Sequence, residues 1–160
     1  QRLSRGLGDV YKRQVQIGKV EKIKTGSDIT VVSYGSTLKI VEKAATELEK
    51  FNISCEIIDC QSLIPFDLDN NICESIKKTN RVIIIDEDFS GGASAYILDN
   101  LINKQNIYDY LDSKPHTLSA QDHRPAYGTD GDYFSKPSVD EVFNKIYSIM
   151  NELNPKKYPI

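Results

Sequence analysis

The sequence predicts an α/β fold: a three-layer α/β/α sandwich with a mainly parallel sheet of about five strands. Segments with the pattern of strands alternate with segments with the pattern of helices, which is typical of parallel strands joined by right-handed helical crossovers. In addition, Val82 to Ile85 are all β-branched, as in a strand covered on both faces. These two observations favour one sheet with helices on both sides.

The first half of the chain contains three of the central strands and two helices. The first helix is indicated by a stripe of apolar residues at intervals of three and four positions, beginning at Leu38 and ending at Phe51. In chain order we expect an edge strand within 17–24, a strand at 29–34, a helix at 38–51, a strand at 54–59, a helix at 67–78 and a strand at 81–86.

The second half adds two helices and one strand. A helix is expected from Gly91 or Gly92 through Ile102, and its continuation to Tyr110 after an interruption near Gln105 is left open. Residues 116–120 form a short strand, and 122–137, rich in Gly, Pro, Asp and aromatic residues without a period, form an ordered loop. Ser138 and Glu141 have the spacing of a capping box at the start of a last helix to Leu153.

Residues 1–14 look unrelated to the rest of the chain. They contain four basic residues against one acid and no apolar periodicity, so we expect a non-native or unrelated leader before one domain at 15–160. That domain keeps 16 of the 20 basic and 22 of the 23 acidic residues, a formal charge of −6. This acidity disfavours nucleic acid as a partner, and no apolar run approaches the roughly 18 residues of a membrane span. We therefore expect a cytoplasmic protein without nucleic-acid or membrane partners.

The most informative segment is the end of the strand at 81–86 together with the residues directly after it. Asp86, Glu87 and Asp88 are succeeded by the pair Gly91-Gly92, which opens a helix at the sheet edge where α/β proteins meet ligands or partners. Three interpretations are open. The helix end could bind phosphate, although the acids oppose it; the acids could cap amides or face solvent while the glycines permit close backbone approach; or the segment could dock a basic partner.

His123 and Arg124 lie on the expected loop near the same sheet edge, where an ion pair of Arg124 with the acids is an alternative. The other histidine, His116, begins a strand and is interpreted as a satisfied structural residue. The sequence has no nucleophile elbow and no dinucleotide glycine fingerprint. Neither histidine is therefore accompanied by a motif for nucleophilic catalysis.

Two further patterns have structural interpretations. The residues Asp67, Asp69 and Asn71 have the spacing of the first calcium-loop ligands, but the later loop positions are wrong, so Asp67 is expected to cap the second helix. The three cysteines have no Cys-x-x-Cys spacing. Cys55 and Cys60 should point to opposite faces of one strand, and we expect reduced, inert thiols.

Several short motifs occur in a characteristic order. They are Ile17-Gly18-Lys19, Gly26-Ser27-Asp28, Ser33-Tyr34-Gly35-Ser36, Gln61-Ser62-Leu63-Ile64-Pro65-Phe66-Asp67, and Asp86-Glu87-Asp88 with Gly91-Gly92. With this set the chain, from about Ile17 to Leu153, resembles the carboxyl-terminal domain of the transketolase-like family. It resembles most closely the beta-subunit part of the decarboxylase component of 2-oxo acid dehydrogenase complexes. Two positions depart from that pattern: the family commonly has Arg where Gln61 stands and an acid where Tyr96 stands.

The resemblance implies that thiamine diphosphate, magnesium and the catalytic residues belong to preceding domains of a parent enzyme, which decarboxylates a 2-oxo acid and transfers the acyl unit to lipoyl. It implies no cofactor bound by this chain alone and no catalytic residue in it. The implied partners are other domains or subunits of a dimeric or heterotetrameric parent and the dihydrolipoyl acyltransferase component. The interface residues are then Asp86, Glu87, Asp88, Gly91, Gly92, His123 and Arg124.

Two alternatives to this interpretation are kept. The chain could be the equivalent domain of a transketolase or of a deoxyxylulose phosphate synthase. It could also be an independent acidic protein-binding module that recognises a basic partner through Asp86, Glu87 and Asp88.

Overall fold

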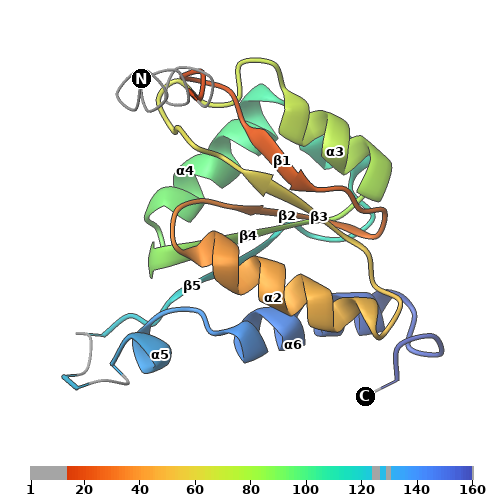
Figure 1. Ribbon diagram of the computed structural model, residues 1–160. Coiled ribbons are helices and arrows are strands. Elements are labelled where there is room, and N and C mark those ends of the chain that lie inside the picture. Colours follow the sequence, from red (N-terminus) through yellow and green to blue (C-terminus); the bar gives the residue numbers. More distant parts are fainter. Residues whose placement is uncertain (1–13, 124–126, 129–130, 160) are drawn as a thin grey trace, which may run out of the picture.

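A computed structural model of the chain describes residues 14–123, 127–128 and 131–159, and in them a five-stranded sheet forms the centre (Figure 1). The strand order is β1-β3-β2-β4-β5; β1 runs antiparallel to β3, and the other neighbours are parallel. The strands are β1 (Glu21–Lys24), β2 (Ile29–Ser33), β3 (Cys55–Asp59), β4 (Val82–Phe89) and β5 (His116–Ala120). The predicted sandwich and its mainly parallel sheet are confirmed.

Helices cover both faces of the sheet, as Figure 1 shows. On one face lie α2 (Thr37–Glu49) and α6 (Val139–Leu153); on the other lie α3 (Asn71–Thr79), α4 (Ala93–Asp99), the π-helical turn η1 (Asn100–Lys104) and the 3-10 turn η2 (Ile107–Tyr110). Side chains of β4 alternate between the two layers: Ile83 and Ile85 pack with α2 and α6, while Val82 and Ile84 pack with α3 and α4. This double burial explains why the strand consists of consecutive β-branched residues.

The cysteines follow the same division. Cys55 belongs to the α2 and α6 layer and Cys60 to the α3 and α4 layer, so the predicted opposite orientation is confirmed. Both thiols are buried and free, and burial raises the pKa of the Cys55 thiol to about 12. A thiol so difficult to ionise is a poor nucleophile or metal ligand.

Helix starts follow the polar residues that the sequence indicates. The Asp67 carboxylate accepts hydrogen bonds from the backbone N–H groups of Asn71 (3.0 Å) and Ile72 (2.9 Å), so it caps α3 without belonging to it. The capping box of α6 is also present: Ser138 Oγ accepts from the Glu141 backbone N–H at 3.2 Å, and the Glu141 carboxylate accepts from the Ser138 backbone N–H at 2.8 Å. Both capping predictions are confirmed.

The segment 122–137 differs from the expected loop, because it contains the short helix α5 (Gly131–Ser135). Two of its side chains, Tyr133 and Phe134, are exposed, so the helix has no buried stripe that would produce a periodic signal. The expected helix after Gly92 is present: α4 runs directly into the π-helical η1, which ends at Lys104. After the break at Gln105 the 3-10 turn η2 continues to Tyr110. Within the described part of the chain, none of the helices is long and apolar enough to cross a membrane.

Candidate functional site at the carboxyl edge of the sheet

The candidate site lies where the order of the strands reverses. From β2 the chain crosses to β3 on one side, and it later returns to β4 on the other side of β2. The carboxyl ends of β2 and β4 therefore flank the switch point at which open α/β sheets usually bind ligands. Tyr34 and Ser36 follow β2 at this edge, and the three acids form the end of β4, which is longer than the expected strand.

The Asp86 side chain is buried and makes its hydrogen bonds inside the domain. It is fully buried and accepts hydrogen bonds from the backbone N–H groups of Ser94 (2.7 Å) and Asp88 (3.0 Å) and from the Tyr34 hydroxyl. Burial, followed by the hydrogen bond to Asp86 and its charge, raises the pKa of Tyr34. The interpretation of Asp86 as an amide cap is therefore confirmed, and its assignment to an interface stays a prediction.

Glu87 and Asp88 remain accessible at this edge. Glu87 is half-buried and accepts a hydrogen bond from Ser36 Oγ at 2.7 Å, and its carboxylate lies 3.5 Å from Lys136 Nζ. Asp88 is exposed, and its carboxylate accepts a hydrogen bond from the Phe89 backbone N–H at 2.9 Å. Of the three acids, Asp88 is thus the one that presents its charge most openly to solvent.

The glycine pair has the structural role that the sequence suggests. Gly91 has φ of 98°, a conformation that favours glycine, and a Cβ atom on Gly92 would lie only 2.5 Å from Asp88 Oδ2. The backbone amide of Ser94, two residues further on, is already occupied by Asp86. The acids that precede this loop and the occupied Ser94 amide make it unsuitable for a phosphate group.

His123 is brought to the acids as expected. It is exposed and lines a hollow of about 250 Å³ together with Glu87, Asp88, Phe89 and Lys136. Arg124 lies outside the described residues, so its ion pair with the acids stays a prediction. The cation that the structure places beside Glu87 is Lys136, which the sequence pattern did not single out.

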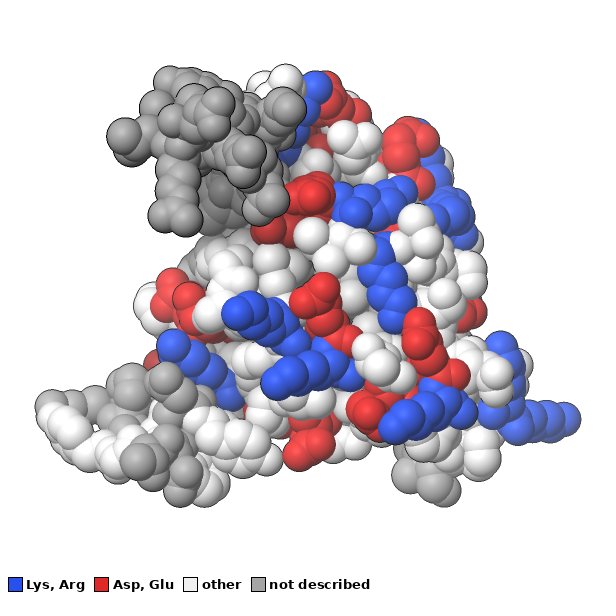
Figure 2. Space-filling model, viewed as in Figure 1, with Lys and Arg blue, Asp and Glu red and all other residues white. Residues whose placement is uncertain are grey.

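Exposed aromatic side chains are the feature of this edge that sequence reasoning missed. Phe89 is 55% exposed, Tyr133 58% and Phe134 65%, although large aromatic side chains are usually buried. A second hollow, of about 310 Å³, lies beside them between the beginnings of α2 and α6 and includes Ile40, Tyr133 and Val139 in its lining. Figure 2, viewed as Figure 1, shows α5 at the lower left, where the described residues are largely uncharged. The aromatic content of 122–137 was the signal that could have indicated it.

The remaining candidates lie elsewhere. Within residues 14–123, 127–128 and 131–159, no group of His, Cys, Asp and Glu is arranged to hold a metal ion. His116 is buried at the start of β5, and its Nε2 has no hydrogen-bond partner among the described residues, so its interpretation as a satisfied residue is wrong. Burial, and then the charges of Lys145 and Lys114, lower its pKa.

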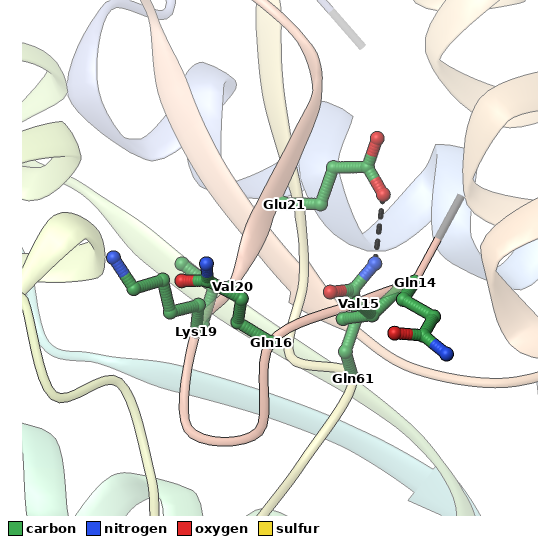
Figure 3. A pocket seen from close by; sticks show the side chains of 7 residues that line it. All are labelled: Gln14, Val15, Gln16, Lys19, Val20, Glu21 and Gln61. Atoms are coloured by element: carbon green, nitrogen blue, oxygen red, sulfur yellow. Dashed lines mark hydrogen bonds between the residues drawn. The ribbon is translucent and has the colours of Figure 1, made fainter. Parts of the chain in front are cut away.

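The two positions that depart from the family pattern both find contacts within the domain. Gln61 Nε2 donates a hydrogen bond of 2.7 Å to Glu21, and Figure 3 shows these two side chains meeting beside a hollow. The Tyr96 ring is 37% exposed and meets the Phe66 ring edge-on, with centroids 6.4 Å apart. Gln61 follows β3 closely in the chain, and Tyr96 lies on α4.

Comparison with known proteins gives a consistent result. The family model described as "Transketolase, C-terminal domain" matches residues 18–136. The pyruvate dehydrogenase E1 component subunit beta of Rickettsia bellii is 32% identical over 136 residues, which cover 84% of this chain and 41% of the relative. The corresponding subunit of Cyanidium caldarium is 40% identical over 134 residues, covering 84% and 40%. The chain therefore spans less than half the length of these curated relatives.

Solved structures support the fold. A split gene transketolase, described as an inactive beta4 tetramer, superimposes with a TM-score of 0.67 at 20% identity, covering 84% of this chain and 42% of the other. Transketolase from Campylobacter jejuni gives a TM-score of 0.51 at 19% identity, covering 82% and 18%.

Proposed function

Because the chain belongs to the transketolase C-terminal domain family, we propose that it is the terminal assembly and docking domain of a thiamine-diphosphate-dependent 2-oxo acid dehydrogenase. The parent enzyme would decarboxylate a 2-oxo acid oxidatively and transfer the acyl unit to lipoyl. The domain, which we assign to residues 15–160, would not be catalytic alone. Its partners would be the other domains and subunits of the parent and the dihydrolipoyl acyltransferase component.

The composition of the carboxyl edge supports contact rather than chemistry. We define the edge surface as Glu87, Asp88, Phe89 and His123, four of the accessible side chains around the hollow beside β4 and β5. The edge surface combines an exposed acid with an exposed aromatic ring. The neighbouring acid Asp86 is buried, and its carboxylate accepts hydrogen bonds from within the domain. Aromatic anchors beside charged groups are typical of protein interfaces, and this pairing is the observation that carries the proposal.

The described residues do not fit the cofactor of the parent enzyme. A diphosphate would have to approach the start of α4, where Asp86 occupies the Ser94 amide and Asp88 is exposed nearby. Magnesium prefers carboxylate ligands, and among the described residues no group of three or more His, Cys, Asp and Glu is arranged to hold a metal ion. We therefore place thiamine diphosphate and magnesium in the preceding domains and derive no catalytic step here.

Charge reversal tests the docking role. Asp88→Lys should weaken capture of the chain by the subunit-binding region of a dihydrolipoyl acyltransferase by on the order of tenfold, because a basic partner would face a repulsive charge. Phe89→Ala should weaken it similarly if the ring is an anchor. Affinities are measured by titration on an immobilised acyltransferase fragment.

Glu74→Lys provides the matched control, since Glu74 is also an exposed acid but lies on α3, away from the edge surface. It should leave capture unchanged. Equal affinities of the wild type, Asp88→Lys and Phe89→Ala would reject docking through the edge surface.

A further inference from the structure

We propose that a second surface, on the β1 and β3 side of the carboxyl edge, is covered by the polypeptide that precedes this domain in longer members of the family. We call it the loop-pair surface and define it by Ile17, Ile64, Phe66, Leu68 and Tyr96. The inference rests on the proposed function, because it requires the chain to be the terminal domain of a larger subunit. It concerns residues outside the edge surface.

The loop-pair surface is held by hydrogen bonds between two loops, 14–20 and 61–68. The Gly18 backbone N–H donates to Ser62 Oγ at 2.8 Å, and the Leu68 backbone N–H donates to the Gly18 carbonyl at 2.8 Å. A Cβ atom on Gly18 would lie 2.7 Å from Leu68 Cδ1 and 2.9 Å from a Pro65 side-chain carbon. The two loops are therefore packed together, and the surface is part of the folded domain.

This packed surface nevertheless leaves large aliphatic side chains in solvent. Ile17 is 76% exposed, Ile64 82% and Leu68 62%. Single exposed apolar residues are common on protein surfaces. Here, however, Gly18, which directly follows Ile17 in the chain, packs against the side chains of Leu68 and Pro65. Phe66 and the partly exposed ring of Tyr96 extend the same apolar area towards α4. These exposed apolar side chains form a patch of the kind that marks a site of contact.

Polar groups and a hollow border the patch. Lys19 and Asp69 form an ion pair at 3.0 Å, and Gln61 is bonded to Glu21. Beside them lies a hollow of about 330 Å³, shown in Figure 3, which is lined by Gln14, Val15, Gln16, Lys19, Val20, Glu21 and Gln61. An apolar centre with a polar rim and an adjacent depression is the usual anatomy of an interface.

The course of the chain selects the occupant. In the Rickettsia bellii relative the match covers only 41% of the subunit, and the matching family model is that of a C-terminal domain, so the remaining polypeptide lies mostly before it. The segment 14–17 through which such a polypeptide enters lines the hollow and contributes Ile17 to the patch. A preceding domain is thus tethered at this surface, and tethering raises its effective concentration there far above that of any free partner.

Cysteine accessibility tests the proposal. Ile64→Cys and Leu68→Cys are made in the 160-residue chain, and again in a chimaera that places the unmatched amino-terminal part of the Rickettsia bellii subunit before residue 14. The native cysteines give little background, because Cys55, Cys60 and Cys73 are at most 5% exposed. The rate of maleimide modification is measured at several protein concentrations. Tyr108→Cys is the matched control, since Tyr108 is 71% exposed and lies on η2, among residues that pack with the far end of α3.

The two patch cysteines should react at least tenfold more slowly in the chimaera than in the 160-residue chain, while Tyr108→Cys reacts equally fast in both. The amino-terminal part is also added as a separate polypeptide, so that a chimaera which fails to fold does not prevent the measurement. Equal patch rates in both arrangements overturn the proposal. Protection that grows with the concentration of the 160-residue chain also overturns it, because the occupant is then a second copy.

These outcomes are independent of the acyltransferase experiment. Protection of the patch without capture through Asp88 would retain the covered surface and reject docking through the edge surface. Capture through Asp88 without protection of the patch would retain docking through the edge surface and reject the covered surface.

Discussion

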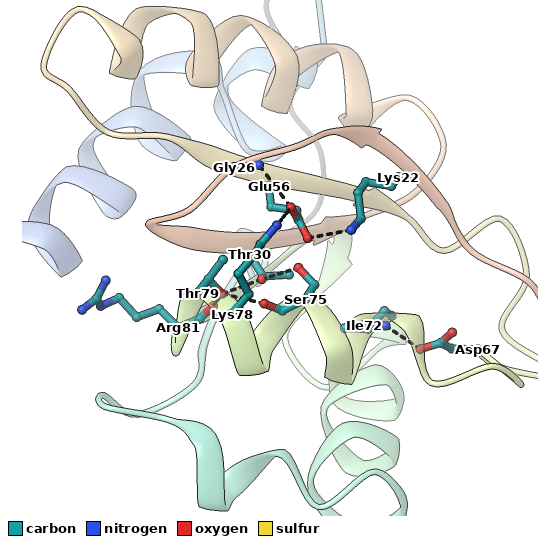
Figure 4. A network of polar contacts seen from close by, with 10 residues as sticks. All are labelled: Lys22, Gly26, Thr30, Glu56, Asp67, Ile72, Ser75, Lys78, Thr79 and Arg81. Atoms are coloured by element: carbon teal, nitrogen blue, oxygen red, sulfur yellow. Dashed lines mark hydrogen bonds and ion pairs between the residues drawn. The ribbon is translucent and has the colours of Figure 1, made fainter.

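At the scale of single residues, Glu56 is a buried acid that forms ion pairs with two lysines. Its side chain is fully buried in β3, and its carboxylate bonds to Lys78 from α3, to the Gly26 backbone N–H at 3.1 Å and to Lys22 from β1 at 3.0 Å (Figure 4). Burial by itself would raise the pKa of Glu56, but the bonds from Lys78, Ser75, Gly26 and Lys22 outweigh it and lower the pKa to about 2. The ionised carboxylate therefore ties α3 and the edge strand β1 to β3.

Glu56→Gln should destabilise the domain by about 2–3 kcal/mol at pH 7, a figure reduced from the full pKa shift because both lysines are about half exposed. The folded-state pKa lies below the unfolded value, so the contribution is present above about pH 4.5 and is lost as the pH falls towards 2. Urea unfolding of both proteins across this range should show the difference shrinking.

Glu47→Gln removes an exposed ion pair with Lys50 and is the control, with an expected loss below about 1 kcal/mol. A difference between wild type and Glu56→Gln that stays constant from pH 7 to pH 2 would contradict the assigned role of Glu56.

His116 is expected to limit stability in mild acid. Its pKa is lowered in the folded state by burial and by Lys145 and Lys114, with an opposing effect of Glu152. Below about pH 6.5 the unfolded chain therefore binds a proton that the folded domain resists, and stability falls with a slope of up to about 1.4 kcal/mol per pH unit. His116→Gln should flatten the dependence between pH 7 and 5 in urea unfolding.

The chain has one other histidine, which makes a complete control available. His123→Gln changes an exposed side chain and serves as the comparison. If both variants alter the slope equally, burial of His116 is not the cause.

At the scale of elements, the local signals of helices and strands explain most of the correct predictions. The apolar stripe of α2, the capping box of α6 and the cap at Asp67 all depend on residues within one or two turns of each other. The short helix α5 was missed for the complementary reason, because its exposed aromatic residues have no buried face and thus no period. A periodic sequence pattern arises from side chains buried on one face, and the aromatic side chains of α5 are exposed.

Ser138→Ala should destabilise the domain by about 1 kcal/mol, because the Glu141 backbone N–H loses the hydroxyl that accepts its hydrogen bond. Thermal unfolding followed by circular dichroism measures the change. Ser148→Ala, within the same helix, should change the stability by less than about 0.5 kcal/mol. Equal losses in the two variants would show that the capping box contributes nothing specific.

At the scale of the whole molecule, the domain combines two buried apolar layers with a carboxyl edge that carries both exposed apolar and charged side chains. Acids and bases are interspersed over the face shown in Figure 2, whereas many of the exposed aromatic and aliphatic residues belong to the edge surface, α5 and the loop-pair surface. Such a distribution suits a domain that contacts other domains along one side.

Thiamine diphosphate with magnesium should give no binding heat when titrated into the 160-residue chain, because the cofactor is assigned to the preceding domains. Isothermal titration calorimetry is the measurement, and the chimaera with the amino-terminal part of the relative serves as the comparison. Micromolar affinity of the 160-residue chain would refute the assignment.

The sequence alone determined the α/β/α architecture, the start of most elements and the family, because these depend on local periodicity, capping and the order of short motifs. It also identified the carboxyl edge as the place of interest through the acids after β4 and the glycine pair. The tertiary structure alone decided how those residues are used. It buried Asp86 against Ser94 and Tyr34, left Asp88 exposed, and placed Lys136 beside Glu87.

The same holds for Glu56, whose lysine partners are 34 and 22 positions away in the sequence, and for the loop pair joined at Gly18 and Ser62. Such contacts join segments that lie on different elements, so no periodic pattern encodes them. Whether a charge is buried and paired or open to a partner is a property of packing, which only the folded chain specifies.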